Sequence, residues 1–156
     1  MAEWHLAQIN IGRIKGVTIN DPVMAEFVEN LDRINQLAEE SKGFVWRLKE
    51  ENNNATSFNP YGDEQVLINM SVWTDIESLE QYVYRTAHTD YLRRRKEWFH
   101  QFGKMYMAMW WVPAGHLPTI AEAVARLDQL QQEGASAQVF DFKRRFPKPE
   151  GAPSQK

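Results

Sequence analysis

The chain has 156 residues, of which 43% are apolar and 25% charged, as in an ordinary single-domain globular protein. A formal net charge of -3 argues against nucleic acid as a partner, and the absence of cysteine excludes disulfides, thiolate metal ligands and a cysteine nucleophile. The longest apolar run, 105–113, is too short to cross a bilayer, and no secretory segment begins the chain. We therefore expect a cytoplasmic protein with no membrane partner.

Alternation of apolar and polar residues predicts four strands, at 4–11, 44–49, 66–73 and 105–112. Successive residues of a strand point to opposite faces of its sheet, so each strand divides into two sets. The sets are Trp4, Leu6, Gln8 and Asn10 against His5, Ala7, Ile9 and Ile11; Phe44, Trp46 and Leu48 against Val45, Arg47 and Lys49; Val66, Ile68, Met70 and Val72 against Leu67, Asn69, Ser71 and Trp73; and Met105, Met107, Met109 and Trp111 against Tyr106, Ala108, Trp110 and Val112. A further short edge strand is expected within 138–146.

A first helix is predicted between the first two strands, because apolar residues recur there at steps of three and four. Pro22 suits its first position, and Asn20 or Asp21 can act as its N-terminal cap. Gly43 is a natural stop at its C-terminal end.

Two helical segments follow the third strand and one follows the fourth. Residues 74–77 have the form of a capping box, with the Thr74 hydroxyl as the cap, and open a helix over 75–84. After a break, a second piece is predicted at 90–102. The last helix runs from another capping box at 119–122 to a glycine at position 134.

The order of these elements predicts an α+β fold of the ferredoxin-like type, an antiparallel sheet with helices on one face. Residues 1–147 form this single domain, and 148–156, which contain no bulky apolar residue, are expected to be a disordered tail. The sheet is apolar on both faces, so we expect its uncovered face to be buried in a homodimer. The polar segment 50–64 is either a solvated loop or a lid.

Several short motifs resemble a known superfamily. Residues 71–73 (Ser-Val-Trp), followed by a capped helix with a late histidine, and 110–113 (Trp-Trp-Val-Pro) resemble the dimeric α+β barrel superfamily, which includes antibiotic-biosynthesis monooxygenases and haem-degrading monooxygenases. Residues 84–88, 93–99 and 115–119 are similar to an uncharacterised domain family within it. The resemblance covers nearly the whole chain, and it implies a dimeric α+β barrel.

His88 is the first candidate for a catalytic residue, because a histidine can gain or lose its proton near neutral pH and act as a base. The alternative is a histidine that caps the end of its helix. Asn10 and Asn69 are the other catalytic candidates, since their amides could hold a developing oxyanion or phenolate. Their alternative is that of buried amides satisfied by neighbouring backbone.

Four residues are candidates for substrate binding: Trp73, Tyr84, Arg85 and Tyr91. In a continuous helix both tyrosines would lie on the side of His88 and offer hydroxyls to a substrate. Each candidate also has an ordinary interpretation, which for Trp73 is a core position, for the tyrosines a packed ring and for Arg85 a solvated side chain. No two histidines have the spacing of metal ligands, so no metal site is expected.

The preferred function is a cofactor-independent monooxygenase that acts on a small aromatic or polyketide-like molecule in an apolar pocket, with His88 as base. The same residues would serve an isomerase or cyclase, and a non-catalytic ligand-binding dimer is a further alternative. A haem-binding or haem-degrading protein is the third. Similarity to that branch implies Asn10, Trp73 and His88 as its site, although His88 follows Trp73 at a longer interval than in that branch. We therefore expect no cofactor.

Overall fold

The structure is a computed structural model that describes residues 4–15, 21–48, 66–85, 98–100 and 107–149. Its elements follow the chain as β1 (Trp4–Ile14), a 3-10 turn η1 (Pro22–Met24), α1 (Ala25–Glu40), β2 (Phe44–Arg47), β3 (Val66–Trp73), α2 (Ile76–Arg85), β4 (Phe99–His100), β5 (Met107–Pro113) and α4 (Ile120–Glu133). The predictions for His88, Tyr91, the segment 50–64 and most of the tail 148–156 lie outside the described residues.

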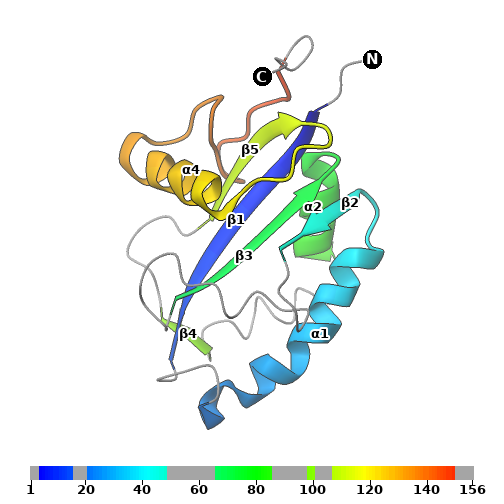
Figure 1. Ribbon diagram of the computed structural model, residues 1–156, viewed down its shortest axis with the longest axis vertical. Helices are drawn as coiled ribbons and strands as arrows, with labels where there is room; N and C mark the ends of the chain where they lie inside the picture. Colours follow the sequence, from blue (N-terminus) through cyan, green and yellow to red (C-terminus); the bar gives the residue numbers. More distant parts are fainter. Residues whose placement is uncertain (1–3, 16–20, 49–65, 86–97, 101–106, 150–156) are drawn as a thin grey trace.

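The sheet is antiparallel, with β1 in its middle (Figure 1). β3 pairs along one side of β1 and β2 lies outside β3, while β5 and then the two-residue β4 pair along the other side. The order β2-β3-β1-β5 is that of a ferredoxin-like sheet. The predicted α+β class is therefore confirmed, and β3 has the bounds that its alternation predicted.

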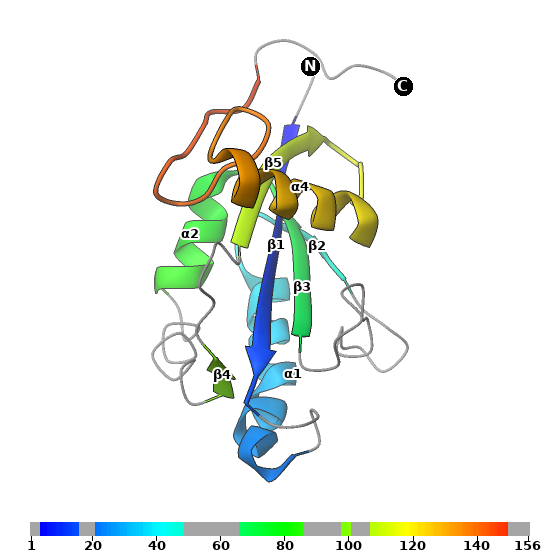
Figure 2. The ribbon, with the colours of Figure 1, turned by 90° about the vertical axis from the view of Figure 1, so that its left-hand side faces the viewer.

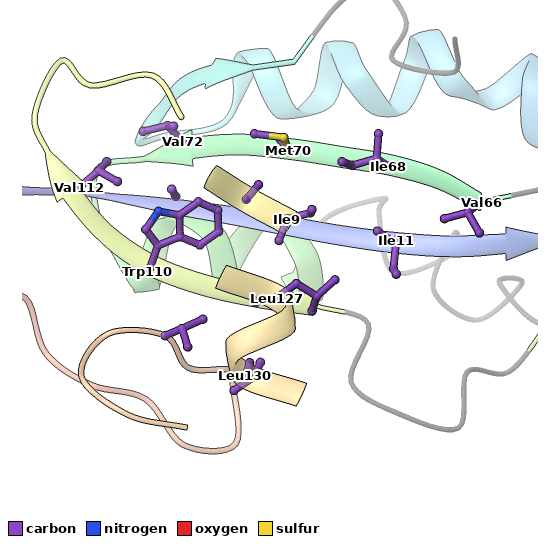
Figure 3. Close-up of a cluster of buried hydrophobic side chains, with 14 residues drawn as sticks. Ile9, Ile11, Val66, Ile68, Met70, Val72, Trp110, Val112, Leu127 and Leu130 are labelled. Atoms are coloured by element: carbon purple, nitrogen blue, oxygen red, sulfur yellow. The ribbon is translucent and has the colours of Figure 1, made fainter. Parts of the chain in front are cut away.

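Helices lie against both faces of this sheet (Figure 2). α1 and α2 pack on the face that carries Leu6, Trp73 and Met109, which we call the α2 face. α4 packs on the opposite face, the α4 face, where its leucines belong to one buried cluster with apolar side chains of β1, β3 and β5 (Figure 3). The predicted division of β1, β3 and β5 into two faces is confirmed by these two clusters.

The prediction that the second face is bare is wrong, because α4 packs on it. Leu127 and Leu130 of α4 are buried in one cluster with Ile9 of β1, and burial of a side chain of this size stabilises the fold by about 1.5–3 kcal/mol. Ile68 and Val112 on the same face are already buried in the single chain. The chain's own last helix thus packs on part of the apolar surface that suggested a homodimer.

β2 does not keep the strict alternation predicted for it. Phe44 is opposite Trp73, yet Trp46 is opposite Val72, so the register shifts by one residue between them. Such a bulge places two residues of one strand against one of its neighbour. Phe44 therefore packs on the α2 face and Trp46 on the α4 face, where the sequence had assigned both to one face.

The predicted helix over 90–102 is also too long, because Phe99 and His100 form β4. β1 continues to Ile14, three residues beyond its predicted end, and its last residues pair with β4. Ile14, Trp98 and Phe99 are buried together with Phe27 of α1, and the Phe27 and Phe99 rings meet edge to face at 5.1 Å. This long-range aromatic contact outweighs the local helical pattern.

Side-chain caps begin three of the helical elements. The Asp21 carboxylate accepts from the N–H of Val23 at 3.1 Å and opens η1, and the Thr119 hydroxyl accepts from the N–H of Glu122 at 3.1 Å and opens α4, as predicted. Thr74, however, is not the cap of α2. The carboxylate of Asp75 accepts from the N–H of Ser78 at 2.7 Å, which begins the helix one residue later.

The segment after α4 contributes a single bridge to the sheet rather than the expected strand. Phe140 exchanges two backbone hydrogen bonds with Met109 of β5, at 2.8 and 2.9 Å. The carboxylate of Asp141 then accepts from the N–H groups of Lys143 and Arg144, both at 2.9 Å. This turn diverts the chain from an extended path, which is why no strand continues through 138–146.

Candidate functional site

Four uncharged polar side chains lie together on the mostly apolar α2 face: Gln8 and Asn10 of β1, and Asn69 and Ser71 of β3. We call them the polar array. Gln8 is directly opposite Ser71, and Asn10 is directly opposite Asn69. Directly opposed residues of an antiparallel pair point to the same side, and residues two apart on one strand do so too. The register therefore brings all four onto one patch of the sheet.

The polar array is bordered by apolar residues on most sides. Across β1, Met109 lies beside Gln8 and Met107 lies beside Asn10. The next row of the sheet is wholly apolar, and its members are Trp111, Leu6, Trp73 and Phe44. Gln8 and Ser71 are buried, Asn10 is half-buried and Asn69 is exposed, so the array is open at Asn69.

Hydrogen bonds connect every member of the polar array. The Nε2 of Gln8 donates to Oδ1 of Asn69 at 2.9 Å and to Oγ of Ser71 at 2.8 Å. The Nδ2 of Asn10 donates to Oε1 of Gln8 and to Oδ1 of Asn69, both at 3.1 Å. Trp73 joins the network, since its indole Nε1 donates to Oγ of Ser71 at 2.8 Å. Five side chains thus form one continuous network at the sheet surface.

Trp73 forms the floor between this network and α2. Its ring is fully buried, stacks on Tyr82 of α2 at 5.2 Å and meets Phe44 edge to face at 5.5 Å. The Tyr82 hydroxyl in turn donates to the carbonyl of Ile34 in α1 at 3.2 Å. Trp73 therefore occupies a core position that holds Ser71 and both helices in place.

Two charged side chains near the polar array, one on the sheet and one at the start of α2, are held by polar partners. Arg47, directly opposite Ser71, is buried, and its Nε lies 3.0 Å from Oε2 of Glu39 in α1. At the start of α2, burial acts to raise the pKa of Asp75, but the hydrogen bonds from Ser78 and Thr74 and the charge of Lys42 outweigh it and lower that pKa. The array itself is neutral.

The structure places Asn10 directly opposite Asn69 on the α2 face, and Trp73 lies on the same face, linked to them through Ser71 and Gln8. Tyr84 is 48% exposed, and its ring meets Phe142 edge to face at 5.4 Å, so it faces the C-terminal segment. His88, Tyr91 and the side chain of Arg85 lie outside what the structure describes. The roles assigned to all of these residues remain predictions.

Sequence reasoning left Gln8 and Ser71 out of the candidate site. The signal was present, because both alternate onto the same face as Asn10 and Asn69 in strands that are otherwise apolar there. Polar residues two apart on each of two neighbouring strands predict such a cluster once the strands are paired in register. What the sequence did not supply was that register.

Of the three residues that similarity to the haem-degrading branch implies, the structure describes Asn10 and Trp73, and Trp73 does not fit a haem. A tryptophan that borders a haem must present its ring to a cavity, whereas the Trp73 ring is fully buried between Tyr82 and Phe44. Its N–H is also committed to Ser71.

A second polar cluster lies at the start of α4. Oε1 of Glu122 is 2.7 Å from Nε2 of His116, and its other oxygen accepts from Nε1 of Trp110 at 2.9 Å. Trp110 belongs to the α4 face, so this cluster is on the opposite side of the sheet from the polar array.

Within the described residues, no three histidine, aspartate or glutamate side chains gather in a way that could hold a metal ion. Among the helices of those ranges, none has the length and apolar composition of a membrane span.

Comparison with known proteins places most of the chain in one family. Residues 5–156 match the family model described as "Domain of unknown function (DUF3291)". No curated protein matches the sequence. Among solved structures, a conserved protein from Methanosarcina mazei Go1 is similar at 12% identity, with a TM-score of 0.49 over 69% of this chain and 90% of that one.

Two further solved structures carry names that refer to an activity. SnoaB, a cofactor-independent oxygenase from Streptomyces nogalater, is similar at 14% identity, with a TM-score of 0.45 over 76% of this chain and 98% of that one. A putative antibiotic biosynthesis monooxygenase from Nitrosomonas europaea is similar at 12% identity, with a TM-score of 0.44 over 75% and 93%. Identities of this size carry no information on activity, and the strand order itself defines the fold.

Proposed function

The chain belongs to the DUF3291 family, whose description assigns no reaction, and from its site we propose that it is a small-molecule enzyme with the polar array at its active centre. The observation that carries this proposal is the array itself. Burial of polar side chains is unfavourable unless they are hydrogen-bonded, and an apolar sheet face needs none of them for stability. Gln8 and Ser71 are nevertheless buried there, beside Asn69, which is open to a ligand.

The reaction we propose is cofactor-independent oxygenation of an aromatic or polyketide-like molecule. His88 removes a proton from a phenol or an acidic C–H group, and the amides of Asn10 or Asn69 stabilise the anion by hydrogen bonds. The electron-rich anion then passes an electron to dioxygen. At an acidic methylene group one oxygen atom becomes the ketone and the other leaves as water with the two hydrogens, so the substrate itself supplies all the electrons.

The apolar residues around the polar array suit this chemistry. Met107 and Met109 lie beside the array, and Leu6 and Trp73 lie in the row next to it. An apolar surround excludes water, which strengthens hydrogen bonds to the anion and keeps protons away from it. Tyr84, Arg85 and Tyr91 remain candidates for substrate contacts beyond the array.

Dioxygen uptake in the presence of dithranol, a hydroxylated anthrone with an acidic methylene group, tests the proposal. The wild-type protein should consume dioxygen and form the corresponding quinone, and His88→Ala should lower the rate by about two orders of magnitude. His116→Ala is the matched control, because that histidine lies on the opposite side of the sheet with Glu122 and should leave the rate unchanged. Absence of uptake, or equal rates for both variants, would refute the proposal. Exchange of the methylene protons with deuterium from the solvent, without uptake, would identify an isomerase-type proton transfer instead.

A homodimer remains a prediction from the superfamily resemblance alone, since α4 packs on the face that first suggested it. Light scattering in solution tests it, with an expected mass twice that of one chain. The mass of a single chain would contradict it without affecting the proposed reaction.

A further inference from the structure

The hydrogen bonds of the polar array point to a coupled unit of three amides. We propose that Gln8 is a positioning residue that fixes the Asn10 and Asn69 amides relative to each other, so that the site offers one NH2 group and one C=O group side by side. Such a site selects a ligand edge with one hydrogen-bond donor and one acceptor, as in a carboxamide or a hydroxy-ketone, over a carboxylate. This inference rests on the proposed function in so far as both use the same site.

The observed contacts fix which atoms face outward. Asn69 uses its Oδ1 to accept from both Gln8 and Asn10, so its Nδ2 is turned away from the network. Asn10 uses both hydrogens of its Nδ2, toward Gln8 and toward Asn69, so its Oδ1 is turned away. Neither outward atom has a partner among the described residues, while Asn69 is exposed and Asn10 half-buried. One donor group and one acceptor are therefore available to a ligand.

One donor and one acceptor face outward whichever way round the oxygen and nitrogen of the three amides are placed. Amide oxygen and nitrogen exchange places when the group makes a half-turn. If all three amides turn together, each of the contacts among Gln8, Asn10 and Asn69 still joins a donor to an acceptor. Asn10 then presents its NH2 group and Asn69 its C=O group. The outward pair is again one donor and one acceptor.

A single amide cannot turn without the others. If Asn69 alone turned, its Nδ2 would face both Nε2 of Gln8 and Nδ2 of Asn10, at the positions now 2.9 and 3.1 Å apart. Two donors would then oppose each other at both contacts. Gln8 couples the two asparagines because it contacts both and is itself only 4% exposed, with little chance to replace these bonds by water.

Ser71 is suited to both senses of the network. Its Oγ must accept from the indole of Trp73, because an indole N–H can only donate. Toward Gln8 the hydroxyl can either accept, as it does here at 2.8 Å, or donate to an amide oxygen after the half-turn. A residue that could only donate or only accept would hold the network in one sense.

The ligand class follows from this arrangement and from the neighbouring charges. A carboxylate presents two acceptors, so one of them would face the outward C=O group without a proton between them. The array is neutral, and the guanidinium of Arg47 is already engaged by Glu39, so neither offers an unengaged cation to a carboxylate. A carboxamide or hydroxy-ketone edge matches both outward groups, and an adjoining ring can lie against Met107.

Binding of an isosteric pair of probes tests the inference without any turnover. We expect 2-naphthamide to bind the wild-type protein at least about tenfold more tightly than 2-naphthoate, because one unpaired polar contact in a site of this kind has an effect of that order. Isothermal titration calorimetry measures both affinities. Equal affinities, a preference for the carboxylate, or no binding of either probe would overturn the inference.

Gln8→Met tests the coupling, because methionine keeps the length of the side chain but bonds to neither asparagine. The preference for 2-naphthamide should fall to about twofold or less as the asparagine amides turn independently. A merely structural defect would weaken both probes alike and leave their ratio unchanged, which would overturn the positioning role. The control is Gln36→Met on α1, where the glutamine is exposed and its side chain bonds, among the described residues, to Glu40 alone at 3.4 Å. It should keep the wild-type ratio.

The two proposals fail separately. A clear 2-naphthamide preference that Gln8→Met abolishes, with no dioxygen uptake on dithranol, would refute the oxygenase and retain the coupled site. Dioxygen uptake that His88→Ala abolishes, with equal binding of both naphthalene probes, would retain the oxygenase and refute the coupling of the amides.

Discussion

Ser71→Ala is the change that most directly tests the network beneath the site. The hydroxyl of Ser71 accepts one hydrogen bond from the indole of Trp73 and one from Gln8, both at 2.8 Å. Alanine removes the acceptor and adds no bulk. Gln8 keeps its bond to Asn69, but the Trp73 N–H is left without the partner shown here in a fully buried position.

The expected cost follows from these contacts. A buried donor left unpaired costs about 1–3 kcal/mol, and the lost bond from Gln8 adds about 1 kcal/mol. We therefore expect Ser71→Ala to lower the free energy of unfolding by about 2–4 kcal/mol. At about 2–4 °C per kcal/mol for a domain of this size, the Tm should fall by roughly 5–15 °C.

Urea unfolding followed by tryptophan fluorescence measures the change, and a second substitution locates its cause. In a Trp73→Phe background the indole N–H is absent, so Ser71→Ala should cost only about 1 kcal/mol there. Ser136→Ala is the matched control, because within the described part of the chain its hydroxyl accepts a single exposed bond, from the backbone N–H of Gln138, and the change should stay within about 0.5 kcal/mol. A cost for Ser71→Ala that is the same in both backgrounds would refute the assigned role of the indole bond.

Three further outcomes are expected. Gly43→Ala should destabilise the fold by more than about 2 kcal/mol in urea unfolding, because Gly43 has a φ of 85° and an added Cβ would collide with the side chain of Ser78; an unchanged midpoint would contradict this. Asp75→Ala should lower the Tm at neutral pH by removing a helix cap worth about 1 kcal/mol. Since the folded pKa of Asp75 is lowered, this stabilisation is present above about pH 4 and is lost as the pH falls through that pKa, so the difference in Tm should narrow in acid; a constant difference would argue against the charge. Leu127→Ala should cost about 2–5 kcal/mol in the same unfolding assay, whereas Leu117→Ala, at a 48% exposed leucine, should cost less than about 0.5; similar values would show that α4 does not bury the α4 face.

The sheet was the part of the fold that the sequence predicted best. An alternation of period two is a direct consequence of strand geometry, and it gave β3 its bounds and gave β1, β3 and β5 their faces. The secondary-structure prediction failed where contacts between distant parts of the chain determine the local structure. The bulge between Phe44 and Trp46 depends on how β2 pairs with β3. β4 forms because Phe99 pairs with Ile14 at the end of β1.

The hydrophobic periodicity of α4 could not predict which face of the sheet the helix packs on, for a related reason. Its pattern shows which of its own residues are buried, such as Leu127 and Leu130, but not which surface they are buried against. The candidate site shows the same division. Alternation put Asn10 and Asn69 on particular faces of their strands, whereas the register that joins them to Gln8 and Ser71 became known only from the paired strands.

The bridge between Phe140 and Met109 covers part of the outer edge of β5. A terminal strand such as β5 presents backbone groups that invite a strand from another molecule, and natural sheets block this route to aggregates. Here both backbone groups of Met109 are already taken by Phe140. A chain cut after Gly134 would lack this bridge and the fully buried side chain of Phe140. It would therefore be prone to fibril-like self-association.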